Sequence, residues 1–386
     1  MLSTIFSKPS MHAVIGVFAS TFIVIGLQWD ISWHESIGRD TLWSPPHMVI
    51  YLGGLLSGLA SGLIVLKTTF GKDEKAKSGS VSFWGFRGPI GAWVSIWGAI
   101  AMLTSAPFDD WWHNAYGLDV EIISPPHLVL AAGFFAILLG TLLLLIAEKN
   151  LANDKKKGFL EFLFMYSASL IVVQFSILLT EYSFANKQHT YEFYLFSLTM
   201  YSFLIIAFRT AAEHKYAATI IATLFILHRL LVIWFLPLFE AEPLLGPIYR
   251  NIDHYVAPYF PALLVIPAFA IDLLHSELSK SNRILKVAIF GVCFSIIFFV
   301  VQWYFAEFLL SEHANNWFFA SDNNKPYWIK IGEHENKFWF QELKPYGQKI
   351  QMKKVTFANF GLLTVFTITF CYMGSYFGSW IRKIKR

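Results

Sequence analysis

The stretch of sequence that organises this chain is residues 30–47, which read DISWHESIGRDTLWSPPH. Asp30 and His34 are four positions apart, so on a helix they share one face and lie one turn apart. The Pro-Pro step at 45–46 begins a second helix, because proline is favoured in the first helical turn, and His47 then lies near its start. One carboxylate and two imidazoles from two consecutive helices form a set of metal ligands.

Residues 109–127, DDWWHNAYGLDVEIISPPH, have the same arrangement. Asp109 and His113 have the spacing of the first pair, and His127 follows a second Ser-Pro-Pro. Asp110 is an alternative ligand, but the spacing favours Asp109. A single histidine in a membrane helix often does no more than hydrogen-bond to a neighbouring helix. Two sets of three ionisable groups with convergent spacing favour a function, because such groups are costly near a bilayer.

The composition is that of an integral membrane protein. Hydrophobic residues make up 55% of the 386 residues and charged residues 15%, whereas a soluble chain has about 25% charged residues. Apolar runs of about 20 residues, the length that crosses a bilayer, recur along the sequence. We therefore predict an all-α, polytopic transmembrane bundle whose partner is the lipid bilayer and not a nucleic acid. The ten predicted spans are 11–29, 46–67, 88–106, 126–147, 158–180, 191–208, 217–238, 257–275, 285–309 and 356–380.

Basic residues in the loops predict the orientation of the spans. The connections after the even-numbered spans are rich in Lys and Arg, whereas those after the first, third, fifth and seventh spans hold only Arg39, Lys187 and Arg250. The positive-inside rule then places both termini in the cytoplasm, in a bacterial-type inner (cytoplasmic) membrane, and both Asp/His motifs on the outer side. The loop 310–355 conflicts with this orientation, since it has seven lysines on the outer side, but four other pairs of loops agree with it.

The first four spans predict a duplicated unit. Spans one and two form a helical hairpin with the first motif, and spans three and four form a second hairpin in the same orientation, which makes a parallel repeat. Polar and aromatic residues mark 310–355 as a short extracytoplasmic cap. The predicted organisation is a metal-binding transmembrane unit at 1–150, spans five to nine at 151–309, the cap, and a last span with a basic cytoplasmic tail at 356–386.

The first motif closely resembles the C subunit of the copper-containing membrane monooxygenases, the particulate methane and ammonia monooxygenases. Trp33, Thr41 and Pro45 are part of the similarity, which covers residues 11–150 and is weaker in the second motif, where the family has Asn in place of Asp109. The resemblance implies an oxidoreductase in which copper activates dioxygen, with two partner subunits. The copper ligands that it implies are Asp30, His34, His47, Asp109, His113 and His127, and the residues around them are Arg39, Asp40 and Asp119.

Two classes of function are consistent with these sites. The first is a copper oxidoreductase that oxidises a small apolar substrate with dioxygen, for which three protein ligands leave open the coordination position required. The second is a membrane protein that binds or transports copper or zinc without oxygenase activity. The eight methionines are scattered, which disfavours a copper(I) conduit. Zinc or iron also accepts two imidazoles and one carboxylate, so the residues leave the metal open, as they do the partner subunits and a homo-oligomer.

Other polar residues have both a structural and a functional interpretation. Arg229 lies in the middle of the seventh span, where it either pairs with Glu181 or Glu213 or lines a polar cavity. Asp253 and His254, in the loop that follows, form an ordinary polar loop or a further group near a metal. The sequence has no Walker loop, no dinucleotide-binding fingerprint, no nucleophile elbow and no CxxCH haem attachment.

Acidic residues near the two motifs predict a difference in metal affinity. The first motif has Arg39 beside Asp40, whereas the second has Asp110, Asp119 and Glu121 without a nearby cation. Local negative charge strengthens the binding of a divalent ion. The sequence therefore predicts that the second site is the tighter of the two.

Overall fold

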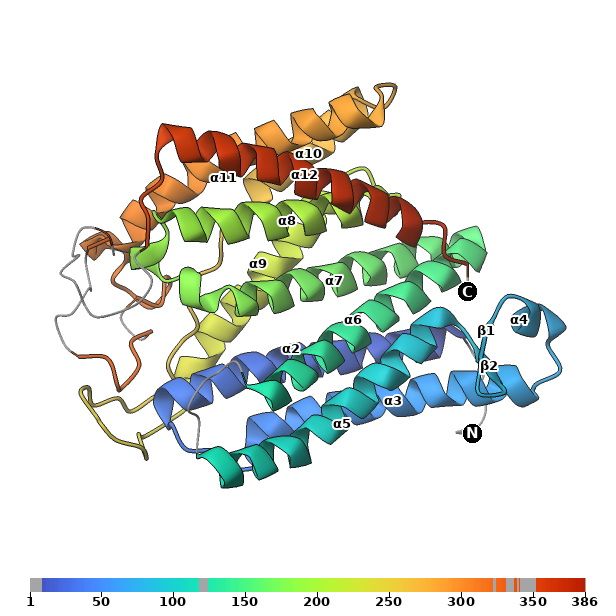
Figure 1. The fold of residues 1–386 in the computed structure, drawn as a ribbon, viewed down its shortest axis with the longest axis horizontal. Helices are drawn as coiled ribbons and strands as arrows, with labels where there is room; N and C mark the ends of the chain where they lie inside the picture. Colours follow the sequence, from blue (N-terminus) through green and yellow to red (C-terminus); the bar gives the residue numbers. More distant parts are fainter. Residues whose placement is uncertain are drawn as a thin grey trace. The chain divides into compact units, whose positions relative to one another are not determined.

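Helices make up most of this computed structural model, which describes residues 9–117, 124–321, 324–330, 337–338, 340 and 352–385 (Figure 1). A helix bonds its backbone polar groups internally, which a bilayer requires of a segment that crosses it. The α-helices are α2 (Pro9–Ser36), α3 (Pro45–Phe70), α4 (Glu74–Ser78), α5 (Ile90–Tyr116), α6 (Pro125–Leu151), α7 (Asp154–Leu178), α8 (Tyr191–Ala211), α9 (Ala217–Phe235), α10 (Val265–Glu277), α11 (Arg283–Leu309) and α12 (Phe357–Ile381). The 3₁₀ helices are η1 (Thr180–Tyr182), η2 (Ala185–Lys187), η3 (Leu236–Leu238) and η4 (Glu312–Ala314), and one antiparallel sheet pairs β1 (Val81–Phe83) with β2 (Phe86–Gly88).

Nine helices among the described residues are long and apolar enough to cross a membrane. They are α2 from Met11 onward, α3, α5, α6, α7, α8, α9 with the turn to Leu238, α11 and α12. The chain thus has the helices of a multi-pass membrane protein, and nine of the ten predicted spans correspond to them. The orientation of the spans and the parallel repeat stay predictions, and much of the predicted cap lies outside the described residues.

The predicted eighth span, 257–275, is not among the nine helices that could cross a membrane, and only its second part is helical. Helix α10 starts only at Val265 and has 13 residues. At 1.5 Å per residue it is about 20 Å long, too short to cross a hydrocarbon core of about 30 Å. Pro258 and Pro261 explain the late start, because proline lacks a backbone N–H and holds the residue before it in an extended conformation. The stretch is apolar because protein buries it: Ala257 and Leu264 have no exposed surface.

Side chains of neighbouring helices bond the non-helical backbone at 257–264. The Leu263 amide donates to Gln302 Oε1 of α11 over 3.0 Å, and the Tyr259 carbonyl accepts from the Arg229 guanidinium of α9 over 2.9 Å. Non-helical backbone at membrane depth is tolerated where protein surrounds it and satisfies its polar groups. This contact gives Arg229 a structural role in holding the extended segment.

The chain divides into two compact units, and the first comprises the residues up to Asp30, residues 40–171 and the tail from Lys383. Within it, α5 and α6 run side by side (Figure 1). A Cβ atom at Gly98 or at Gly133 would meet the backbone oxygen of the other glycine at 2.8–2.9 Å. Small residues of this kind let two membrane helices approach closely, which fixes their register. The predicted division of the chain into four parts stays a prediction.

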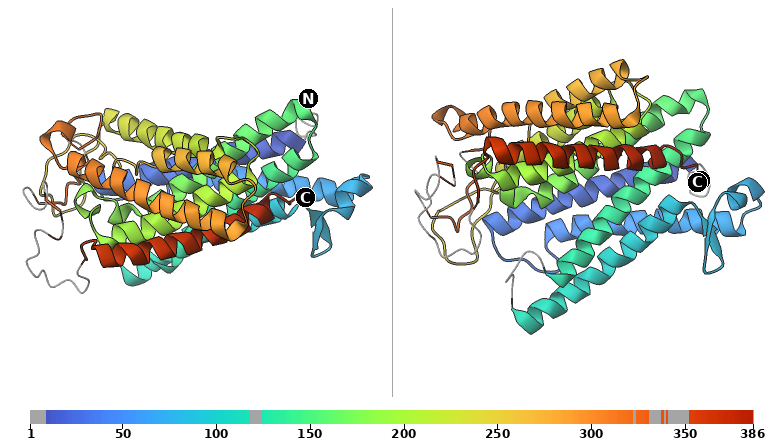
Figure 2. Two further views of the ribbon diagram at one scale, coloured as in Figure 1. Left: turned by 90° about the horizontal axis from the view of Figure 1, so that it is seen from above. Right: turned by 45° about the horizontal axis from the view of Figure 1, so that its top comes forward.

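The second unit comprises residues 31–39 and 172–382, with α8 to α12. Figure 2 shows α12 lying along α8, and Gly374 of α12 faces the Phe203 carbonyl of α8. A buried ion pair joins α8 to α10, because Arg209 Nε lies 2.6 Å from Asp272 Oδ1. Neither side chain is more than 7% exposed.

Asp272 also caps the start of α9. Its carboxylate accepts from the amides of Ala218 and Thr219, over 3.3 and 2.8 Å, and from Thr219 Oγ1 over 2.7 Å. The first amides of a helix have no partner within it, so one carboxylate here satisfies two of them as well as Arg209. Three helices of the second unit therefore depend on Asp272.

Substituting Asp272→Asn is expected to lower the free energy of unfolding by about 3–5 kcal/mol, because the buried Arg209 loses its counter-charge. Thermal or denaturant unfolding of the detergent-solubilised protein measures the loss. The control is Asp154→Asn, whose side chain is 99% exposed and lies 3.5 Å from Lys157. An exposed pair of this kind contributes less than about 1 kcal/mol. Similar losses in the two variants would contradict the role given to Asp272.

Candidate metal centres

The conformation of the chain at the end of α2 determines the path of the connection to α3. The Gly38 amide donates to the Trp33 carbonyl, and Gly38 has a φ of +81°, the left-handed conformation in which many helices end. The Trp33 indole Nε1 donates to the Arg39 carbonyl over 2.9 Å, and the Thr41 amide donates to Ser44 Oγ over 2.8 Å. These bonds fold the connection back, and α3 begins with the Pro-Pro step as the sequence predicts.

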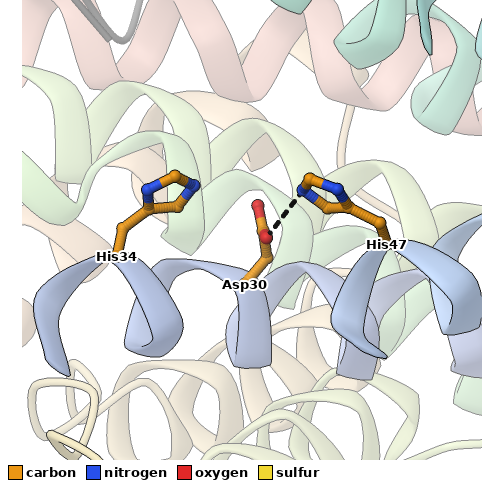
Figure 3. A group of neighbouring side chains, drawn as sticks. All are labelled: Asp30, His34 and His47. Atoms are coloured by element: carbon orange, nitrogen blue, oxygen red, sulfur yellow. Dashed lines mark ion pairs between the residues drawn. The ribbon is translucent and has the colours of Figure 1, made fainter. Parts of the chain in front are cut away.

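Asp30 and His34 of α2 and His47 of α3 come together at this junction (Figure 3). Each residue offers one ligand atom, and the three atoms lie within 4.8 Å of one another. The carboxylate lies between the two imidazoles, with Asp30 Oδ1 3.0 Å from His47 Nε2. The side chains of Asp30 and His47 are each 16% exposed, so the group is shielded from bulk solvent but remains reachable.

A hydrogen bond to the backbone, on the side of the ring away from Asp30, fixes the orientation of His47. His47 Nδ1 lies 2.8 Å from the Thr41 carbonyl, and since a carbonyl only accepts, Nδ1 carries the hydrogen. Nε2 therefore points to the carboxylates and is the atom available to a metal, which is how ligating histidines are commonly held. Asp40, predicted to lie near the ligands, has its Oδ2 3.3 Å from the same Nε2. The first site thus has two carboxylates around one imidazole nitrogen.

Asp109 and His113 of α5 and His127 of α6 form the second group, again with their ligand atoms within 4.8 Å of one another. Asp109 lies 3.3 Å from His113 Nε2 and 3.4 Å from His127 Nε2. His113 Nδ1 lies 3.2 Å from the Gly117 carbonyl, so this ring is held as His47 is. Asp110 is exposed and its carboxylate accepts from the Asn114 amide, which leaves Asp109 as the carboxylate of the group.

The spacing of the donor atoms fits a small transition-metal ion. Bond lengths of about 2.0–2.1 Å and angles near the tetrahedral value place neighbouring donors about 3.3 Å apart. In the structure Asp30 and His47 have a nitrogen–oxygen separation of 3.0 Å, Asp109 and the two imidazoles have separations of 3.3–3.4 Å, and all ligand atoms of each group lie within 4.8 Å of one another. Two neutral imidazoles with one carboxylate suit copper, zinc or iron alike. A proton on Nε2 competes with the ion for the same position, so low pH weakens binding.

The two groups lie at the same level on neighbouring helices. Gly54 of α3 faces Met102 of α5. Gly54 is seven positions from His47 and Met102 is seven positions from Asp109, so on antiparallel helices the two ligands reach the same height. Tyr51, one turn from His47 on α3, has its ring centroid 6.1 Å from that of His47. The sequence analysis missed Tyr51, although its spacing of four from His47 was visible.

The remaining sequence candidates lie outside the two groups. Arg39 is exposed, and its described bond is the one that its carbonyl accepts from Trp33. Asp119 lies outside the described residues. His254 Nδ1 donates to Asp253 Oδ1 over 2.8 Å, a bond that lowers the pKa of Asp253, whose side chain is 96% exposed. Asp253 and His254 thus pair with each other at the surface and belong to neither described group.

No family model, curated protein or solved structure matches this chain. The features of the chain that bear on its function are therefore the two Asp/His/His groups, which could hold metal ions, and the membrane-type helices that carry them. The metal, the reaction and the kinship with the copper monooxygenase subunit stay proposals.

Alanine at His34 or His47 is expected to remove about half of the metal that the purified protein binds, and alanine at His113 or His127 the other half, because each group loses one of three ligands. Metal analysis after dialysis measures the stoichiometry. His254→Ala is the matched control, since it removes a partly exposed histidine that also lies beside an aspartate. Unchanged metal content in all four ligand variants would rule out the two sites.

Proposed function

We propose that this protein is a membrane oxidoreductase that holds copper at both Asp/His/His sites and oxidises a small apolar substrate with dioxygen. The observation that carries the proposal is the pair of compact two-histidine, one-carboxylate groups at the same level on adjacent helices. The resemblance of residues 30–47 to the copper monooxygenase subunit supports copper over zinc or iron. It also supports a complex with partner subunits.

The residues of each site have separate tasks in this proposal. Bound copper would supply one-electron redox chemistry with dioxygen. Asp30 and Asp109 provide negative charge that offsets the charge of the ion, and the imidazoles provide neutral nitrogen donors. The Thr41 and Gly117 carbonyls keep Nδ1 of His47 and His113 protonated, so that Nε2 remains the donor. The surrounding apolar helices give small apolar molecules access from the bilayer.

A second candidate function is the transport of copper or zinc across the membrane. The non-helical segment 257–264, followed by the short helix α10, is the observation that favours it. Helices interrupted at membrane depth are typical of transporters, where unwound backbone lines the substrate site. In this chain Gln302 and Arg229 bond that backbone. We rank transport second because no residue of 257–264 belongs to either described metal group.

Isotopically labelled dioxygen separates the two functions. In native membranes loaded with copper, the label is expected to enter an oxidised small hydrocarbon, and His47→Ala is expected to lower the yield by more than about tenfold through loss of a ligand. Membranes that contain this chain alone show whether partner subunits are required. Copper or zinc flux into vesicles without any incorporation of label would contradict the oxidoreductase and establish transport.

The outer placement of the metal sites is tested by cysteine labelling. Trp43, whose side chain is 74% exposed, lies in the connection between α2 and α3 beside the first site. In intact cells an impermeant thiol reagent is expected to label Trp43→Cys and not Ser78→Cys, which lies in the Lys-rich connection. The unsubstituted protein is the control, since Cys371 is buried and Cys293 lies within α11. Labelling of Ser78→Cys alone would invert the topology.

A further inference from the structure

The hairpin formed by β1 and β2 places a tryptophan at its tip. Phe83 pairs with Phe86, so the turn consists of Trp84 and Gly85. Both have positive φ, 49° and 81°, the type I′ geometry that Asn and Gly usually occupy. A tryptophan in this conformation is unfavourable by roughly 1–2 kcal/mol. Its ring is 80% exposed, so burial in this chain does not compensate for the unfavourable conformation.

Aromatic rings connect the hairpin to the helices beside it. Phe83 packs against Trp93 and Trp97 of α5 at centroid distances of 5.5 and 5.8 Å, and Trp84 lies 6.0 Å from Trp97. Two-stranded hairpins are marginally stable in water, so these contacts help to order it. We call the following residues the aromatic patch: Phe70, Phe83, Trp84, Phe86, Trp93 and Trp97.

Hydrogen bonds fix the aromatic patch where two candidate spans end. The Trp93 indole Nε1 donates to the Val81 carbonyl over 3.2 Å. Thr69, in the last turn of α3, accepts from the Arg87 amide over 2.8 Å, and its hydroxyl donates to the Arg87 carbonyl over 3.2 Å. The patch therefore lies at the end of α3 and the start of α5. A membrane that these helices cross has its interface at this level.

Exposed cations of the first unit gather at this end. Lys72 follows α3, and the Arg87 guanidinium donates to the Lys77 carbonyl over 3.2 Å while remaining exposed. Three acidic residues here have partners close in the sequence: Asp73 accepts from the Ala76 amide, Glu74 lies 3.2 Å from Lys77, and Asp154 lies 3.5 Å from Lys157. Lys155, Lys156 and Lys383 add further exposed positive charge within the same unit.

We propose that the aromatic patch, with Lys72 and Arg87 beside it, binds the headgroup layer of an anionic phospholipid leaflet. Tryptophan is enriched at membrane interfaces, where an apolar ring and a polar N–H are both accommodated. Cations near such a surface are attracted by its negative charge. The unfavourable backbone conformation of Trp84 is then explained, because it directs the indole ring into the headgroup layer. This inference is independent of the metal sites.

Hydrogen–deuterium exchange of residues 81–88 tests the proposal in the full-length protein. Nanodiscs of phosphatidylcholine are compared with nanodiscs that also contain phosphatidylglycerol. The anionic lipid is expected to slow exchange in the hairpin. Arg87→Gln is expected to reduce that slowing about fivefold, the factor that one cation near an anionic surface contributes. Arg87→Lys keeps the charge and is expected to keep the effect.

Trp84→Ala is expected to speed exchange of the hairpin in both lipids, whereas Trp43→Ala, an exposed tryptophan of another connection, leaves it unchanged. Exchange in α5 and α6 shows that each variant is folded. Equal exchange of the wild-type hairpin in the two lipids would overturn the proposal. Protection that rises with protein concentration would also overturn it, because a second copy of the chain would then cover the patch.

Discussion

The register between antiparallel helices is the constraint on which both candidate metal centres depend. Gly53 of α3 lies against the backbone of α2 at Ala19, and Gly54 lies against Met102 of α5. These close approaches fix the height and rotation of α3 relative to both neighbours. A shift of one residue would rotate a ligand by about 100° away from its partners. The packing that holds His47 beside Asp30 therefore also places it level with Asp109.

Local signals in the sequence predicted most of the candidate site. The spacing of Asp30 and His34 defines one helix face without any tertiary information. The Ser-Pro-Pro-His order does the same for the first turn of the next helix, because proline is favoured there and the histidine takes the third position. The position of Asp40 near the ligands was predicted only from a resemblance, and its contact with His47 was not predicted. That contact requires the connection to fold back, and the bonds made by Trp33 and Ser44 cause that fold.

Apolar residues that pack against protein can have the composition of a membrane helix, and at 257–264 this composition predicted a helix that starts too early. The segment 257–264 has the composition of a span, and only Pro258 and Pro261 indicate that it is not helical. The partners that satisfy its backbone come from α9 and α11, at separations that no local pattern reveals. The same is true of Asp272, which lies in an apolar run and joins three helices.

The charges of the described residues differ between the two groups, whereas the order of affinity expected from the sequence stays a prediction. That expectation counted acidic residues along the chain, whereas packing decides which of them face an ion. Asp30 and Asp40 both lie within 3.3 Å of His47 Nε2, so a divalent ion there would be fully neutralised. In the second group Asp109 faces the imidazoles and Asp110 is exposed, whereas Asp119 and Glu121 lie outside the described residues. A low-dielectric environment disfavours any net charge that the ligands leave on a bound ion, so the carboxylates that face the ion influence its affinity. The second carboxylate of the first group, Asp40, is therefore the described feature that favours a divalent ion there.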